Sequence, residues 1–148
     1  MYILFKLSIL SLLFILFGSG LWILFLVSGG KDISLEDLRA KYEVDASQYV
    51  EFDGILIHFI DEGEGDPIIL THASYHSARA WDGVAEKLKN NFRVIRFDFP
   101  NSGLSGFDDK NRYTVDHYQT IITQLSNHLN IERFHLIGTS SGGTVAFR

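Results

Sequence analysis

A serine between two glycines is the residue whose setting points most directly to chemistry. Ser140 stands at the centre of a Gly-x-Ser-x-Gly pattern in residues 138–142, after an apolar stretch and before a helical pattern. When a strand, a tight turn and a helix follow one another, the central side chain projects from a strained turn, and the glycines let strand and helix approach closely. The pattern predicts a nucleophilic hydroxyl at Ser140. The N–H of Ser141, at the helix start, would then face a developing oxyanion.

A phosphate-binding loop is the main alternative for this glycine-rich turn. Gly138 and Gly143 have the spacing of such a loop, but Thr144 stands where the phosphate-binding lysine belongs. Val145 occupies the next position, which should be Ser or Thr. Short Gly-Ser patterns also arise by chance, so the elements around Ser140 must support its assignment.

The composition narrows the classes of function. The 148 residues carry 13 Lys and Arg against 18 Asp and Glu, a net charge of −5, and no run of basic residues. Nucleic acid is therefore not an expected partner. The sequence contains no Cys, which excludes disulfides, a thiolate nucleophile and a Cys-ligated metal.

The amino-terminal segment is the strongest signal outside the serine pattern. Leu7–Ser28 has no charged residue and is long enough to cross the ~30 Å hydrocarbon core of a bilayer as a helix. Residues 1–30 are therefore predicted to be a single transmembrane anchor, which makes the membrane a partner. A signal peptide cleaved near Ser28-Gly29-Gly30 is the alternative, although the small residues 18–20 are followed by further apolar sequence.

The segment after the anchor is predicted to be a linker over residues 31–48. Ser34 and Asp37 form a capping-box pattern, which predicts a short spacing helix over Leu35–Tyr42. Lys6 before the span is balanced by Lys31 and other basic residues, mixed with acidic ones, after it, so charge does not fix the orientation. We expect the globular part to lie outside the cytoplasm.

Residues 49–148 have the pattern of an α/β domain. Asp53-Gly54 between two alternating runs predicts an antiparallel hairpin, with His58 on its exposed face. Strands and helices then alternate, which predicts a mostly parallel sheet with flanking helices. The expected elements are hairpin strands at 49–52 and 55–60, strands at 68–70, 92–97 and 133–137, a helix burying Trp81, Val84, Ala85 and Leu88, and a helix capped by Thr114 that buries Val115, Tyr118, Ile121, Ile122, Leu125 and Leu129.

From about Tyr49 to Arg148 the chain resembles the amino-terminal half of an α/β-hydrolase-fold enzyme. Three motifs occur in the order of that family. Residues 70–74, Leu-Thr-His-Ala-Ser, resemble its His-Gly turn. Residues 98–105, Asp-Phe-Pro-Asn-Ser-Gly-Leu-Ser, resemble its D-x-P-G-x-G-x-S loop, and residues 138–142 match its nucleophile elbow. The helix begun at Thr144 shows no stop signal, so we expect a longer protein.

The resemblance implies a serine hydrolase. Ser140 would be the nucleophile, and the backbone N–H groups of Ser74 and Ser141 would form the oxyanion hole. An ester or similar acyl substrate would pass through an acyl-enzyme, with no cofactor and no metal. In this family the Asp or Glu and the His of the triad follow the Ser, so they are expected beyond Arg148, and residues 1–148 alone are expected to be inactive.

Two positions depart from the family pattern. Ala73 and Asn101 stand where Gly is usual; Asn tolerates a left-handed conformation, whereas a Cβ at residue 73 would be harmless only if φ is negative. Ala73 supports the alternative of a catalytically inactive member that binds a ligand or partner at the membrane. The resemblance also admits carbon–carbon bond hydrolases and haloperoxidase-like members, whereas Ser140 argues against dehalogenases and epoxide hydrolases, which use Asp at the elbow.

Overall fold

The computed structural model describes residues 2–28 and 33–148, with side chains from residue 10 onward. The chain divides into two compact units, Met1–Ser34 and Leu35–Arg148. The alternative cleavage point at Gly29-Gly30 and the charge of Lys31 lie outside the described residues, as does the side chain of Lys6.

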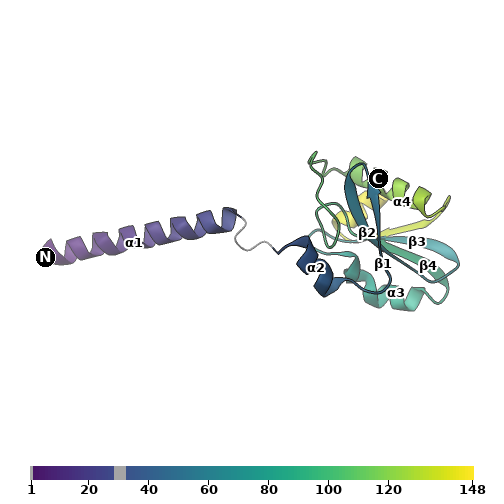
Figure 1. The fold of residues 1–148 in the computed structure, drawn as a ribbon, viewed down its shortest axis with the longest axis horizontal. Coiled ribbons are helices and arrows are strands. Elements are labelled where there is room, and N and C mark those ends of the chain that lie inside the picture. Colours follow the sequence, from purple (N-terminus) through teal and green to yellow (C-terminus); the bar gives the residue numbers. More distant parts are fainter. Residues whose placement is uncertain (1, 29–32) are drawn as a thin grey trace. The chain divides into compact units, whose positions relative to one another are not determined.

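The first unit contains one long apolar helix, α1, over Tyr2–Val27 (Figure 1). Its segment Leu10–Val27 has a mean hydropathy of 2.5, and none of that segment is buried. A helix that is apolar on every side needs an apolar environment, and the described part of the protein does not bury Leu10–Val27. Its length and composition fit either a single membrane span or a signal sequence.

The second unit is built on a five-stranded mixed sheet with the order β1-β2-β4-β3-β5. The hairpin strands β1 and β2 are antiparallel, and β2 also runs antiparallel to β4. β3 lies between β4 and β5 and is parallel to both. The predicted antiparallel hairpin is confirmed, but the sheet is mixed rather than mostly parallel, because β2 also pairs antiparallel with β4. The strands are β1 Ser47–Phe52, β2 Ile55–Glu62, β3 Asp66–Thr71, β4 Phe92–Phe97 and β5 His135–Gly138.

The hairpin forms as predicted. Asp53 and Gly54 have φ values of 50° and 85°. Positive φ at both central residues defines the type I′ turn, whose twist matches that of the two strands it joins. The turn also fixes the register, so that Val50 lies opposite Ile57.

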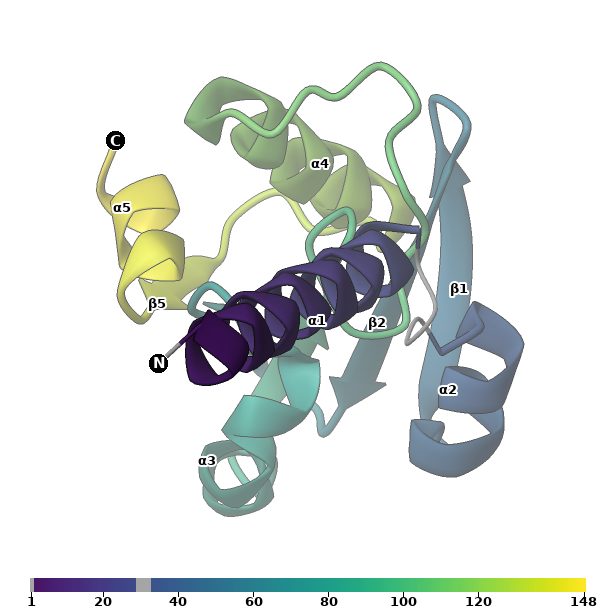
Figure 2. The same ribbon diagram turned by 90° about the vertical axis from the view of Figure 1, so that its left-hand side faces the viewer.

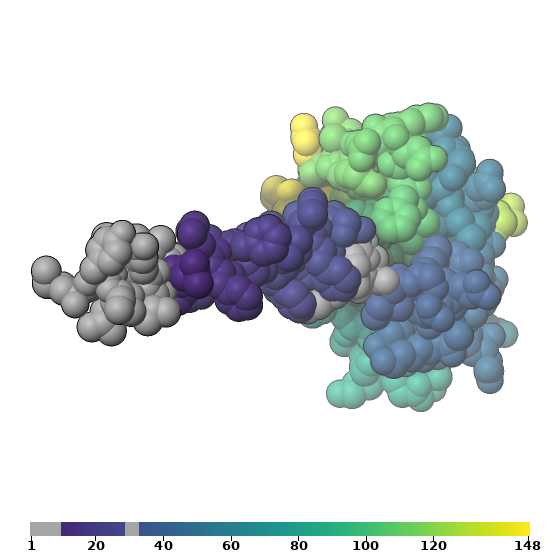
Figure 3. Space-filling view, turned by 60° about the vertical axis from the view of Figure 1, so that its left-hand side comes forward, coloured from purple at the N-terminus to yellow at the C-terminus, as the bar shows by residue number. Residues whose placement is uncertain are grey.

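Helices cover both faces of the sheet (Figures 1 and 2). One face carries a short 3-10 turn, η1 Ala78–Trp81, followed by α3 Asp82–Leu88. The other carries α4 Val115–His128 and α5 Ser141–Phe147. The side chain of Thr114 caps α4 by accepting a hydrogen bond of 3.2 Å from the His117 N–H, as predicted. The short helix α2 covers Leu35–Tyr42, the predicted range, and lies on the surface of the second unit (Figure 3).

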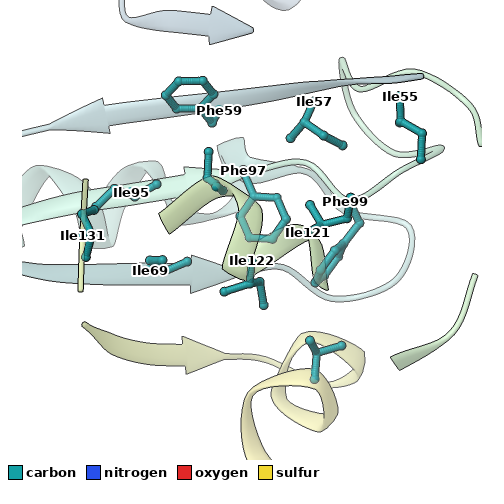
Figure 4. Packing of buried hydrophobic residues seen from close by; sticks show 12 residues of the cluster. Ile55, Ile57, Phe59, Ile69, Ile95, Phe97, Phe99, Ile121, Ile122 and Ile131 are labelled. Atoms are coloured by element: carbon teal, nitrogen blue, oxygen red, sulfur yellow. The ribbon is translucent and has the colours of Figure 1, made fainter. Parts of the chain in front are cut away.

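Two apolar clusters hold these layers together. Beneath α3, Ala85 packs with Ile68, Leu70 and Val94 from the sheet. The larger cluster lies between the sheet and α4, where side chains from β2, β3 and β4 meet those of the helix (Figure 4). Its members include Ile55, Ile57, Phe59, Ile69, Ile95, Phe97, Phe99, Ile121, Ile122, Leu125 and Val145.

Two predicted side-chain environments were wrong. His58 is 1% exposed rather than on a solvent face, because consecutive residues of β2 are buried on both faces of the sheet and the His58 ring lies between Asp98 and Ser47. Strict alternation of burial holds only where one face of a strand meets water. Val84 is 41% exposed on α3, while Trp81, Ala85 and Leu88 contact the sheet as expected.

We expect Ile69→Ala to lower the free energy of unfolding by about 3 kcal/mol, because Ile69 is fully buried in the larger cluster and the substitution leaves a cavity. Urea denaturation followed by circular dichroism measures this loss. Val84→Ala is the matched control and should change stability by less than ~1 kcal/mol, since Val84 is largely exposed. Equal losses in the two variants would contradict the described core.

Candidate active site

Ser140 occupies the tip of the turn between β5 and α5. Its backbone has φ 50° and ψ −119°, a conformation that L-residues rarely adopt and that costs roughly 1–3 kcal/mol. The residue is exposed, and its carbonyl accepts the N–H of Thr144 at 3.0 Å, which begins the hydrogen bonding of α5. The turn therefore presents the Ser140 side chain to solvent on a backbone that is fixed from both sides.

The end of β3 holds this turn in place. The Thr71 hydroxyl donates to the carbonyl oxygen of Gly142 at 3.0 Å, and the Thr71 carbonyl accepts the N–H of Thr139 at 3.2 Å. Thr71 is fully buried, so these bonds form away from water. A buried polar pair is costly to break, because each group would lose its partner without gaining a water molecule.

Both glycines of the turn are required by close backbone contacts. A Cβ on Gly138 would lie 2.3 Å from the carbonyl oxygen of Gly142, and a Cβ on Gly142 would lie 2.4 Å from that of Thr71. No side chain fits at such distances. Strand, turn and neighbouring strand therefore touch through their backbones, which is the approach that the glycine spacing predicts.

The two residues predicted to form the oxyanion hole lie next to each other. Ser74 follows β3 and Ser141 begins α5, and the Ser74 hydroxyl donates to the Ser141 hydroxyl oxygen at 3.0 Å. The N–H of Ser141 is in the first turn of a helix and has no acceptor within it. Among the described residues neither the Ser74 amide nor the Ser141 amide donates a hydrogen bond. Their role toward an oxyanion stays a prediction.

The two departures from the expected glycines have clear geometries. Asn101 has φ 60°, the left-handed conformation that Asn tolerates best after Gly. Ala73 is not among the described residues with positive φ, so its Cβ is accommodated without backbone strain. Tyr75, two residues after Ala73, does have a positive φ of 62°, and its side chain is fully exposed.

His72 supports the loop after β3 and is not available as a base. It is 1% exposed; Nδ1 donates to the Ala73 carbonyl at 2.8 Å, and Nε2 accepts the N–H of Phe99 at 3.1 Å. Burial lowers the pKa of His72 below its ordinary value, which favours the neutral ring that these two bonds require. His72 thus ties the loop after β3 to the loop after β4.

Asp98 organises a buried network that sequence analysis missed. One carboxylate oxygen accepts the N–H of Ala78 at 2.6 Å, and the other accepts that of Leu104 at 2.9 Å. The second oxygen also lies 2.8 Å from Nδ1 of His58, whose Nε2 is 2.8 Å from the Ser47 hydroxyl. Two features of the sequence could have indicated this network: the lone His58 in the apolar run 55–60, and Asp98 directly after β4.

The Ser47, His58 and Asp98 side chains follow the order of atoms found in a catalytic triad, but their surroundings are those of a structural network. His58 and Asp98 are each 1% exposed, and the Ser47 oxygen already accepts the N–H of Val44 at 3.1 Å. The imidazole and the carboxylate of this group therefore lie away from solvent. The network instead joins the start of β1 to the loops that follow β3 and β4.

Cavities extend from the turn over the carboxyl ends of the strands. A cavity of about 70 Å³ has Ser74 and Ser141 in its wall, with His72, Phe99 and Tyr118. A second cavity of about 460 Å³ shares Ser74 and Tyr118 with the first and adds Tyr75 and Tyr113. His76 also lines this second cavity.

The other histidines lie away from the turn. His117 and His128 are on α4 and His135 is on β5, and among the described residues none of them bonds to Ser140. Within the part of the chain that the structure describes, no group of three or more His, Asp or Glu residues is arranged to hold a metal ion.

Comparison with known proteins gives a consistent result. The family model for the alpha/beta hydrolase fold matches residues 66–148. Haloalkane dehalogenase 2 of Mycobacterium tuberculosis is 29% identical over 61% of this chain and 32% of its own length. A soluble epoxide hydrolase of a Corynebacterium species is 30% identical over 64% and 33%, and 2-hydroxy-6-oxo-6-phenylhexa-2,4-dienoate hydrolase of Comamonas testosteroni is 29% identical over 65% and 35%.

Solved structures agree on the fold. An alpha/beta hydrolase fold protein from Burkholderia ambifaria superimposes with a TM-score of 0.64 at 24% identity, covering 69% of this chain and 37% of that protein. The chain spans about a third of the length of the curated relatives that it matches.

Gly142→Ala is expected to destabilise the protein by at least about 2 kcal/mol, because the new Cβ meets the Thr71 carbonyl. Gly83→Ala is the matched control: Gly83 is also helical, nothing lies within 4 Å of an added Cβ, and Ala has the higher helix propensity. That variant should be more stable by about 0.5–1 kcal/mol. Denaturant titration of both proteins measures the difference, and equal shifts would refute the close contact.

We expect His72 to make the protein less stable in mild acid. Its pKa is lowered in the folded state, so as the pH falls through 6.5 the unfolded chain takes up a proton that the folded chain excludes. The free energy of unfolding should then fall by at most about 1.4 kcal/mol per pH unit for this one group. His72→Gln should flatten the dependence between pH 7 and pH 5, measured by urea denaturation; His117, whose pKa burial also lowers, is common to both proteins.

Proposed function

This chain belongs to the alpha/beta hydrolase fold family, and from that premise we propose that it is a membrane-anchored serine hydrolase that cleaves an ester or similar acyl bond. The observation that carries the proposal is the backbone of Ser140, held at φ 50° on an exposed turn beside Ser74 and Ser141. A strained, fixed and accessible hydroxyl next to two free amides is what acyl transfer requires.

The proposed reaction has two steps. In the first, Ser140 Oγ attacks the acyl carbon and loses its proton to a base, while the N–H groups of Ser74 and Ser141 hold the oxyanion. Each such donor is worth about 3 kcal/mol in the transition state. The leaving group departs with a proton, and water then hydrolyses the acyl-enzyme by the same route. The base and the carboxylate that orients it are proposed to lie beyond Arg148, in the order that the family uses.

The identity of the nucleophile favours acyl substrates over the halides and epoxides named for two of the relatives. Attack of a carboxylate on an alkyl carbon gives an ester, which water can hydrolyse. Attack of a serine hydroxyl on the same carbon would give an ether, which has no carbonyl for an oxyanion hole to act on. Ser140 can turn over only if the bond it forms is an acyl ester, so hydrolysis of an ester or of an activated carbon–carbon bond suits it.

The anchor is the second part of the proposal. We propose that α1 is not cleaved and crosses the membrane once, with the second unit outside the cytoplasm. Its support is the unburied apolar surface of Leu10–Val27. A catalytically inactive, ligand-binding or partner-binding member remains the alternative. Ala73 was the feature that favoured it, and the negative φ of Ala73 removes that reason.

Labelling by a fluorophosphonate tests the nucleophile. The full-length protein should be labelled, and Ser140→Ala should lose labelling completely, because the reagent needs an activated hydroxyl. Thr123→Ala, at an exposed hydroxyl on α4, is the control and should keep full labelling. Equal labelling of Ser140→Ala, with circular dichroism showing the same fold, would rule out the proposed role of Ser140.

A further inference from the structure

Besides the space above Ser140, the second unit has a groove beside α2. It measures about 650 Å³ and lies between α2, the segment 75–80 and the loop after β4. Its walls are largely apolar and include Leu38, Tyr42, Tyr75, Ala80 and Leu104. The proposed acyl chemistry uses none of these side chains, so the groove needs an explanation of its own.

The groove is continuous with the candidate active site. Tyr75, His76 and Gly103 line both the groove and the 460 Å³ cavity. That cavity in turn shares Ser74 with the small cavity that reaches Ser141. A molecule whose carbonyl lies at the Ser140 turn can therefore extend past Tyr75 into the groove through connected cavities.

Helix α2 is held in place as a wall of the groove. The guanidinium of Arg79 donates to the Tyr42 carbonyl at 3.0 Å, and its Nε donates to Asp82 at 2.6 Å. At the other side of the helix, the Arg39 guanidinium lies 4.6 Å from the centre of the Tyr49 ring, within cation–π range. These contacts hold α2, which carries Leu38 and Tyr42, against the rest of the second unit.

The groove has little to offer a charged ligand. Asp98 borders it, but both carboxylate oxygens are occupied by the Ala78 and Leu104 amides and by His58. Arg79 also lines the groove, but its guanidinium donates to Asp82 and to the Tyr42 carbonyl. With both of these charged groups engaged, the groove presents mostly hydrocarbon and aromatic surface, from which an apolar chain displaces water.

We propose, resting on the hydrolase function proposed above, that this groove binds the apolar chain of an amphiphilic acyl substrate drawn from a membrane. The carbonyl lies at Ser140 and the chain runs past Tyr75 toward α2. The membrane source rests on the proposed anchor: the chain that carries the groove also carries α1, whose apolar segment Leu10–Val27 is unburied.

A chain-length series on the full-length protein tests the proposal. The quantity measured is the ratio of kcat/KM for p-nitrophenyl dodecanoate to that for p-nitrophenyl acetate. Leu38→Asp places a charge in the groove and should lower this ratio about tenfold. Ala80→Trp fills the groove from the opposite wall and should lower it similarly. Val84→Asp changes an exposed apolar residue outside the groove and should leave the ratio unchanged.

The outcomes separate this inference from the proposed function. If no ester is cleaved and the fluorophosphonate does not label Ser140, the hydrolase proposal fails. If labelling and acetate hydrolysis are intact but both groove variants keep the wild-type ratio, the groove does not bind the chain. Wild-type protein should also hydrolyse monooleoylglycerol held in phosphatidylcholine vesicles; activity on the soluble dodecanoate ester without activity on these vesicles would overturn the membrane source.

Discussion

The rest of the site depends on one constraint, the close backbone contact between the end of β3 and the turn after β5. Thr71 meets Gly142 by a hydrogen bond and by an approach that leaves no room for a Cβ. That contact fixes where α5 can begin, and the strained conformation of Ser140 persists because strand and helix are both held. It also brings Ser74, which follows β3 closely, beside Ser141.

Asp98 performs the corresponding task for the loops around the site. Its carboxylate receives one N–H from the start of η1 and another from the loop after β4, so a single buried group sets the relative position of two loops that line the cavities. Through His58 and Ser47 the same network extends to the chain just after α2. The Asp98 side chain thus helps to position both the wall of the groove and the loop that carries Ser74.

Local signals predicted the elements of the second unit well, because each had its own cause in adjacent residues. Asp53-Gly54 set the hairpin turn, Thr114 set the start of α4, and the glycines around Ser140 set the strained turn. What failed depended on contacts distant in sequence. Alternation could not reveal that both faces of β2 are covered, so His58 was misplaced and its partner Asp98, 40 residues away, was missed. The antiparallel pairing of β2 with β4 likewise could not be predicted from adjacent residues.

The Ser47, His58 and Asp98 side chains carry a lesson about recognising enzymes by shape. The hydrogen bonds among these three groups have the sequence of a Ser-His-Asp triad, whereas no described His or Asp bonds to the Ser140 hydroxyl. Solvent exposure separates the two sites: the His58 imidazole and the Asp98 carboxylate are buried, whereas Ser140 is exposed. Template methods applied to this family should therefore weight accessibility and main-chain strain above the spacing of side-chain atoms.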